Sequence, residues 1–167
     1  MKRLIASILI AVPVLAFGAD KSPDAAFFKN AAEGGIAEVE AGNLAQSKGN
    51  SQAVKDFGAM MVKDHSAAND KLKAIAASEN VTLPTSPSVS QMAMKTKLDV
   101  LSGDTFDKSY IKGQIKAHQD TAALFKKEIA SGTDTQAKAF ATATLPTVQA
   151  HLKKIRQIAA EAGVTAK

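Results

Sequence analysis

Four long segments of this chain have helical periodicity, and each is bounded by residues that stop or cap a helix. No segment shows the strict alternation of apolar and polar residues that indicates a β-strand. The pattern therefore predicts an all-α protein. The predicted helices run from Ser22-Pro23 to about Lys48, from Ser51 to about Glu79, from Asp104 to about Ala130, and from Thr133 or Asp134 onward.

The connections between these helices predict how they pack. Two are short, whereas residues 80–90 hold Pro84 and Pro87 and form a longer crossing, followed by a short helix over Met92–Leu101. Two short links and one long link favour an antiparallel four-helix bundle with a short extra helix in the crossover. Pro146 lies inside the last helix and is expected to kink it.

The N-terminus has the features of a signal peptide. Met1-Lys2-Arg3 is positively charged, and the apolar run from Leu4 to Phe17 is shorter than the roughly 20 residues of a membrane span. We expect residues 1–19 to be a signal peptide, cleaved after Gly18 or Ala19; an uncleaved anchor is the alternative. Residues 20–167 would then form a single bundle domain in the periplasm, without a membrane span.

Composition excludes several classes of protein. The chain has no cysteine, so it cannot be a lipoprotein with an acylated Cys and cannot form disulfides or thiolate metal sites. Removal of Lys2 and Arg3 leaves 19 of the 21 basic residues against 16 acidic ones, and the formal charge falls from +5 to +3. This charge is spread along helical faces, and aromatic residues are scarce, so we expect no nucleic-acid partner. The sequence does not identify a protein partner.

Each predicted helix has one stripe of apolar and small residues, spaced alternately three and four apart, that would face the core. Each stripe contains one polar side chain with metal-binding chemistry. All four lie about 15 residues into their own helix, so antiparallel packing would bring them to one level. We call Glu38, His65, His118 and His151 the polar layer.

Each buried polar group without a partner lowers the stability of the fold by roughly 1–3 kcal/mol. The side chains of the polar layer must therefore either hydrogen-bond to one another or bind a ligand. One carboxylate and three imidazoles suit a single divalent zinc, iron, manganese or copper ion with an open coordination position. Asp64 is placed to accept a hydrogen bond from a neighbouring helix, and a solvated flank of its own helix is the alternative. Tyr110 is placed to close one end of the layer by hydrogen bonding. The alternative is a hydrogen-bonded cluster that only sets helix register.

Residues outside the polar layer give weaker indications of function. Asp107 is interpreted as a partner of the dipole of its own helix, because it lies three turns from His118. Met60, Met61, Met92 and Met94 are interpreted as core filler rather than copper ligands. The chain has no phosphate-binding loop and no nucleophile motif, so no catalytic residue is assigned and turnover is not required. An enzyme with an open mononuclear site would need a wet cleft that reaches the layer.

Five sequence features point to a known family when they are taken together. They are Ala37-Glu38-Val39-Glu40-Ala41-Gly42, Val62-Lys63-Asp64-His65, Phe106-Asp107-Lys108-Ser109-Tyr110, His118, and Thr144-Leu145-Pro146 followed by His151. With these features the chain resembles the ferritin-like exported bacterial family of domain of unknown function 4142. The resemblance covers about residues 25–160 and implies a ferritin-like four-helix bundle with no established activity. The motif positions that it implies are Glu38, Asp64, His65, Asp107, Tyr110, His118, Pro146 and His151.

The chain departs from the di-iron ferritin-like proteins in one respect. Those proteins use Glu-x-x-His pairs, whereas the residues three before the histidines here are Val62, Ile115 and Val148. A di-iron oxidase or an iron-storage shell is therefore not expected. The sequence predicts an exported bundle that binds one metal ion or small ligand at the polar layer, in envelope metal handling or stress protection. The alternative is a structural or interaction protein.

Overall fold

The computed structural model describes residues 24–165, and this part of the chain is all helical with no strand. The prediction of an all-α protein is confirmed. The signal peptide predicted over residues 1–19 lies outside the described residues. Within them, no helix is both long and apolar enough to cross a membrane. The helices are α1 (Ala25–Lys48), α2 (Gln52–Ser78), α3 (Val89–Asp99), α4 (Gly103–Ser131) and α5 (Thr135–Glu161).

Side-chain caps explain where several helices begin. The Ser51 hydroxyl accepts the backbone N–H of Val54 at the start of α2, and Asp134 accepts that of Ala137 at the start of α5. Ser88 and Gln91 form a capping box. This box starts the short helix at Val89, three residues before the predicted Met92.

Two further predictions concern the start of the first helix and a kink at Pro146. The predicted first cap, Ser22-Pro23, lies outside the described residues, and the observed N-cap of α1 is Asp24. Helix α5 runs continuously through Pro146. The backbone therefore tolerates the missing N–H of the proline without ending the helix.

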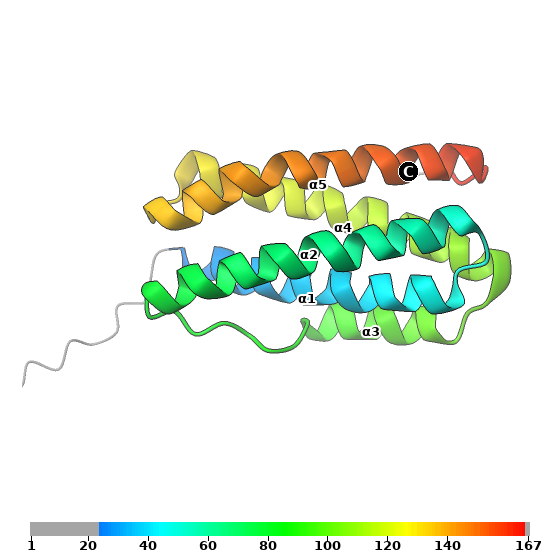
Figure 1. The fold of residues 1–167 in the computed structure, drawn as a ribbon, viewed down its shortest axis with the longest axis horizontal. Coiled ribbons are helices and arrows are strands. Elements are labelled where there is room, and N and C mark those ends of the chain that lie inside the picture. Colours follow the sequence, from blue (N-terminus) through cyan, green and yellow to red (C-terminus); the bar gives the residue numbers. More distant parts are fainter. Residues whose placement is uncertain (1–23, 166–167) are drawn as a thin grey trace, which may run out of the picture.

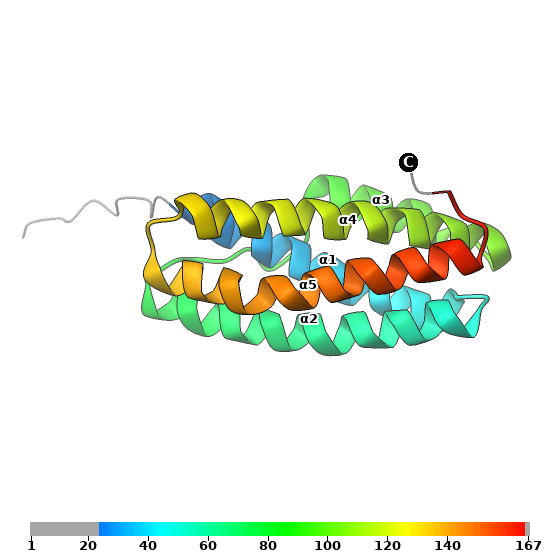
Figure 2. The same cartoon turned by 90° about the horizontal axis from the view of Figure 1, so that it is seen from above.

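The four long helices lie side by side along the long axis of the molecule (Figures 1 and 2). The most extensive contacts are between α1 and α2 and between α4 and α5, while α3 lies outside, against α1 and α4. Helices α1 and α2 approach closely at Gly42 and Gly58. A Cβ atom on either glycine would lie 2.7 Å from the carbonyl oxygen of the other, so both positions require the absence of a side chain.

Two apolar clusters fill the two ends of this arrangement. In α4, His118 lies between Ile115 of one cluster and Ala122 of the other, so the polar layer separates the clusters. The Phe57 cluster consists of Ala45, Val54, Phe57, Met61, Phe106, Tyr110, Ile111, Ile115, Ile155, Ile158, Ala159 and Val164. The Phe28 cluster consists of Phe27, Phe28, Ala32, Leu72, Ala76, Ala122, Phe125, Ala137, Phe140, Ala141 and Val148.

Candidate metal centre

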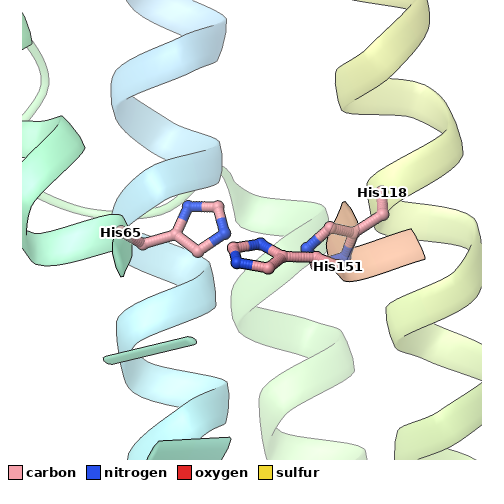
Figure 3. Close-up of side chains that lie close together, drawn as sticks. All are labelled: His65, His118 and His151. Carbon is pink, nitrogen blue, oxygen red and sulfur yellow. The ribbon is translucent and has the colours of Figure 1, made fainter. Parts of the chain in front are cut away.

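The three histidines of the chain meet at mid-length, each from a different long helix (Figure 3). The ring centroid of His65 lies 5.7 Å from that of His118 and 5.5 Å from that of His151, and the latter two are 5.4 Å apart. One nitrogen from each ring can be chosen so that all three lie within 4.8 Å of one another. His118 and His151 are only 1% and 2% exposed, and His65 is partly buried.

Hydrogen bonds fix the tautomers of two rings. Nδ1 of His118 lies 2.9 Å from the carbonyl oxygen of Gln114, and Nε2 of His151 lies 2.9 Å from Oδ2 of Asp64. A carbonyl or carboxylate oxygen only accepts, so in neutral rings these nitrogens carry the protons. The opposite nitrogens, Nε2 of His118 and Nδ1 of His151, are therefore left with lone pairs.

These two nitrogens and Nε2 of His65 are buried and have no hydrogen-bond partner among the described residues. Burial, together with the smaller effects of the nearby rings of His118 and His151, lowers the pKa of His65 to about 3. Burial also lowers the pKa of His151, although the hydrogen bond to Asp64 opposes this. His65 and His151 are therefore neutral near pH 7, which is the form that binds metal ions.

Glu38 does not join the three histidines. Its Oε1 lies 3.9 Å from Nδ1 of His118, the nitrogen that donates to Gln114, and not beside the free Nε2. Burial raises the pKa of Glu38, against the lowering effects of His118 and of a hydrogen bond from Gln114. The stripe on α1 correctly places Glu38 inside the protein, but its carboxylate lines a space between α1, α3 and α4. The structure therefore assembles three of the four predicted ligands.

The two expected supporting residues behave differently. Asp64 accepts a hydrogen bond from a neighbouring helix, as expected, through His151. Tyr110 does not hydrogen-bond within the layer, because its hydroxyl has no partner among the described residues. Its ring instead stacks on Phe106 within the Phe57 cluster, with centroids 6.0 Å apart. Burial and then the charge of Glu38 raise the pKa of Tyr110 well above its ordinary value.

Asp107 has a role that the sequence analysis missed. Its two carboxylate oxygens accept the backbone N–H groups of Asn50 and Ser51, each at 2.8 Å. Asp107 of α4 thus caps the start of α2, a contact beyond the predicted interaction with the dipole of its own helix. These partners are more than 50 positions away, so the local sequence carries no signal for the contact. The role of Gln114 was also missed, although its position four residues before His118 could have indicated it.

Comparisons with known proteins agree with this fold. A crystal structure of a Streptomyces coelicolor protein, named as a candidate secreted protein with domain of unknown function 305, superposes with a TM-score of 0.75. The two chains share 15% identity over 89% of this chain and 99% of the other, so the likeness concerns fold alone. A comparison with curated proteins finds no match. The profile of a domain of unknown function, DUF4142, matches residues 13–158, and the chain belongs to that family.

Proposed function

We propose that this protein binds one divalent transition metal ion through His65, His118 and His151. The observation that supports the proposal is the meeting of three buried ring nitrogens that have no partner among the described residues. Leaving such atoms unpaired costs about 1–3 kcal/mol each, and a bound ion would remove that cost. Three protein ligands leave a coordination position open for water or a small ligand.

The donor set narrows the choice of ion. Neutral imidazoles suit zinc, copper and iron, whereas manganese favours carboxylate and water oxygens. Because Glu38 lies outside the cluster, manganese has less support than the other three ions. Zinc with three histidines and one open position is the arrangement that we propose first.

The three rings must move inward to bind an ion. Zinc lies about 2.0–2.1 Å from each imidazole nitrogen, which places tetrahedral ligand nitrogens about 3.3 Å apart. The nitrogens here lie within 4.8 Å of one another, so small ring rotations would close the site. Asp64 and Gln114 hold two of the rings by their opposite nitrogens, as partners of metal-binding histidines commonly do.

We also propose that the four long helices form an antiparallel ferritin-like four-helix bundle, which α3 joins in the crossover. The extensive contacts of α1 with α2 and of α4 with α5 support this class. The charged and apolar start of the sequence supports export to the periplasm through a signal peptide. In that compartment a single-ion site suits metal handling or stress protection, and no catalytic residue is assigned.

Metal content tests the proposal. Tag-free mature protein purified from the periplasm should contain about one equivalent of transition metal by inductively coupled plasma mass spectrometry. The His118→Leu, His151→Leu double variant should contain none, and Glu38→Gln, a change at the same level of the core, should retain the metal. Circular dichroism of each variant would verify that it folds.

The rival function is a register-setting cluster, which the position of the polar layer between two apolar clusters favours. It predicts no metal in any variant, even after incubation with zinc, copper, iron and manganese salts. Loss of metal from Glu38→Gln would instead support the four-ligand site that the sequence predicts.

A further inference from the structure

A cavity lies beneath α3, and none of the three histidines lines it. It has a volume of about 90 Å³ and lies between α1, α3 and α4. Glu38, Tyr110 and Gln114 line it together with an apolar rim that includes Ala41 and Leu98. We call it the α3 chamber. It has room for several water molecules or one small organic molecule.

Three buried oxygen atoms belong to the residues that line the chamber, and none has a hydrogen-bond partner among the described residues. They are Oε2 of Glu38, the hydroxyl of Tyr110 and Oε1 of Gln114. The three side chains are 5%, 1% and 4% exposed, so bulk solvent does not satisfy them. None of them supplies a nitrogen to the metal centre. A cavity lined by three unpaired buried polar groups is unfavourable unless something fills it.

The chemistry of these oxygens specifies the occupant. A carboxylate and an amide oxygen only accept hydrogen bonds, and a phenol can accept one as well. An occupant must therefore bring donors, and a positive charge would compensate Glu38 with charge-assisted hydrogen bonds. A primary ammonium has three N–H donors and one positive charge, which matches three acceptors that include one carboxylate. The apolar rim would accommodate a short alkyl chain.

The cover of the chamber allows exchange with solvent. None of the residues of α3 is buried, and Met94 of this helix is 49% exposed. Figure 1 shows α3 outside the four long helices, at the end of a long connection from α2. A small displacement of α3 would open the chamber without separating the long helices, because the two apolar clusters do not include α3 among their buried members.

We propose that the α3 chamber binds a small primary amine in its ammonium form, with Glu38, Tyr110 and Gln114 accepting its three N–H groups. None of these three oxygens is a proposed ligand of the metal ion, although Glu38 and the backbone carbonyl of Gln114 also lie beside His118.

Isothermal titration calorimetry with propylammonium chloride tests the proposal on metal-free mature protein at pH 7.5. Saturable binding of one equivalent is expected, at least tenfold tighter than binding of 1-propanol, which has the same alkyl chain without the charge. Tetramethylammonium, a cation without N–H donors, should not bind. Glu38→Gln should weaken binding at least tenfold and Tyr110→Phe about threefold. Glu161→Gln, which removes an exposed charge at the end of α5, should leave binding unchanged.

Lys95 of α3 also lines the chamber and offers the same ammonium chemistry from within the chain. The variant Lys95→Met distinguishes the ammonium of Lys95 from that of a free amine as the occupant of the chamber. Unchanged affinity for propylammonium in this variant would leave the free amine as the occupant, whereas affinity at least fivefold higher would show that Lys95 competes for the same oxygens. Either result supports an ammonium site.

Equal binding of propanol and propylammonium, or no saturable binding to either wild type or Lys95→Met, would overturn the proposal. Zinc titrations of the same preparations distinguish a failure of the amine site from a failure of the metal centre. Zinc binding without amine binding would contradict only the chamber, and amine binding without zinc binding would contradict only the proposed function.

Discussion

The two apolar clusters and the polar layer between them differ in how well their atoms are satisfied. The clusters contain fully buried rings such as Phe28, Phe57 and Phe106, which need only close packing. At the level between them, three imidazole nitrogens and a carboxylate oxygen are buried without partners among the described residues. The same four helices thus have ends filled mainly by apolar side chains and a middle where unpaired polar atoms gather, while the hydroxyl of Tyr110 in the Phe57 cluster is also unpaired among the described residues.

This difference separates stability from binding. Burial of large apolar side chains stabilises the fold at both ends, whereas each unpaired polar atom of the layer lowers stability. Sites that hold a ligand are commonly less stable than the structure around them, because their polar groups are arranged for the ligand. We infer that the ends hold the helices in place and that the middle serves binding.

The largest expected change in the free energy of unfolding is at the two apolar clusters. Phe28→Ala should lower the free energy of unfolding by about 3–5 kcal/mol, because Phe28 is 0% exposed and the change leaves a cavity. In metal-free protein, His118→Leu should change it by only about 1 kcal/mol, because it removes an unpaired nitrogen together with its hydrogen bond. Urea denaturation measures both. Similar losses for the two variants would contradict the comparison.

The next effect is the response of the metal-free layer to acid. The pKa of His65 is about 3 in the folded protein and near 6.5 in the unfolded chain, so only the unfolded chain takes up the proton between these values. Stability should therefore fall as the pH is lowered from 6.5, by up to about 1.4 kcal/mol per pH unit for one histidine. His151, whose pKa is also lowered, acts in the same direction.

Glu38 opposes this trend. Its folded pKa is raised, so its contribution to stability is present below the unfolded value and is lost as the pH rises through the folded pKa. The test is therefore cleanest in Glu38→Gln protein, with urea denaturation between pH 6.5 and 4.5. On acidification, the free energy of unfolding of Glu38→Gln should fall more steeply than that of wild type. Adding His65→Leu to this variant should make the fall less steep. A flat profile in Glu38→Gln would rule out a neutral, buried His65.

A smaller effect is expected at the partner of His151. Asp64→Asn should weaken zinc binding by about 10–100-fold, because it removes the carboxylate that orients the ring and sets its tautomer. Competition titrations with a zinc chelator measure this change. Asp70→Asn, on an exposed part of the same helix, is the matched control and should bind zinc as wild type does. Equal affinity of the two variants would mean that Asp64 does not support the site.

The smallest effect is expected for the carboxylate of the polar layer. Glu38→Gln should change zinc affinity by less than about threefold, because Glu38 lies beside Nδ1 of His118 and not beside its free Nε2. The same competition titration applies. A loss of zinc affinity of tenfold or more would indicate that Glu38 binds the ion directly.

Much of this arrangement could be predicted from the helical periodicity. The spacing of apolar and small residues placed His118 and His151 in the core, and equal depth in each helix placed them at one level with His65. The helix caps at Ser51 and Asp134 could also be predicted from the sequence, because a capping side chain lies within three residues of the N–H group that it accepts.

The remaining features depend on contacts between distant segments. Periodicity gives the face on which Glu38 lies, but it does not give the direction of its carboxylate within that face. The direction depends on how α1 sits against α3 and α4. The cap that Asp107 provides to Asn50 and Ser51 likewise joins α4 to the start of α2, and no local pattern encodes it.

X-ray absorption at the zinc K-edge tests the central claim most directly. For mature protein loaded with one equivalent of zinc, the account predicts three imidazole nitrogens at about 2.0–2.1 Å and one further light ligand in the open position. A spectrum dominated by oxygen ligands, or one unchanged in the His118→Leu, His151→Leu variant, would show that the three histidines do not form the metal centre.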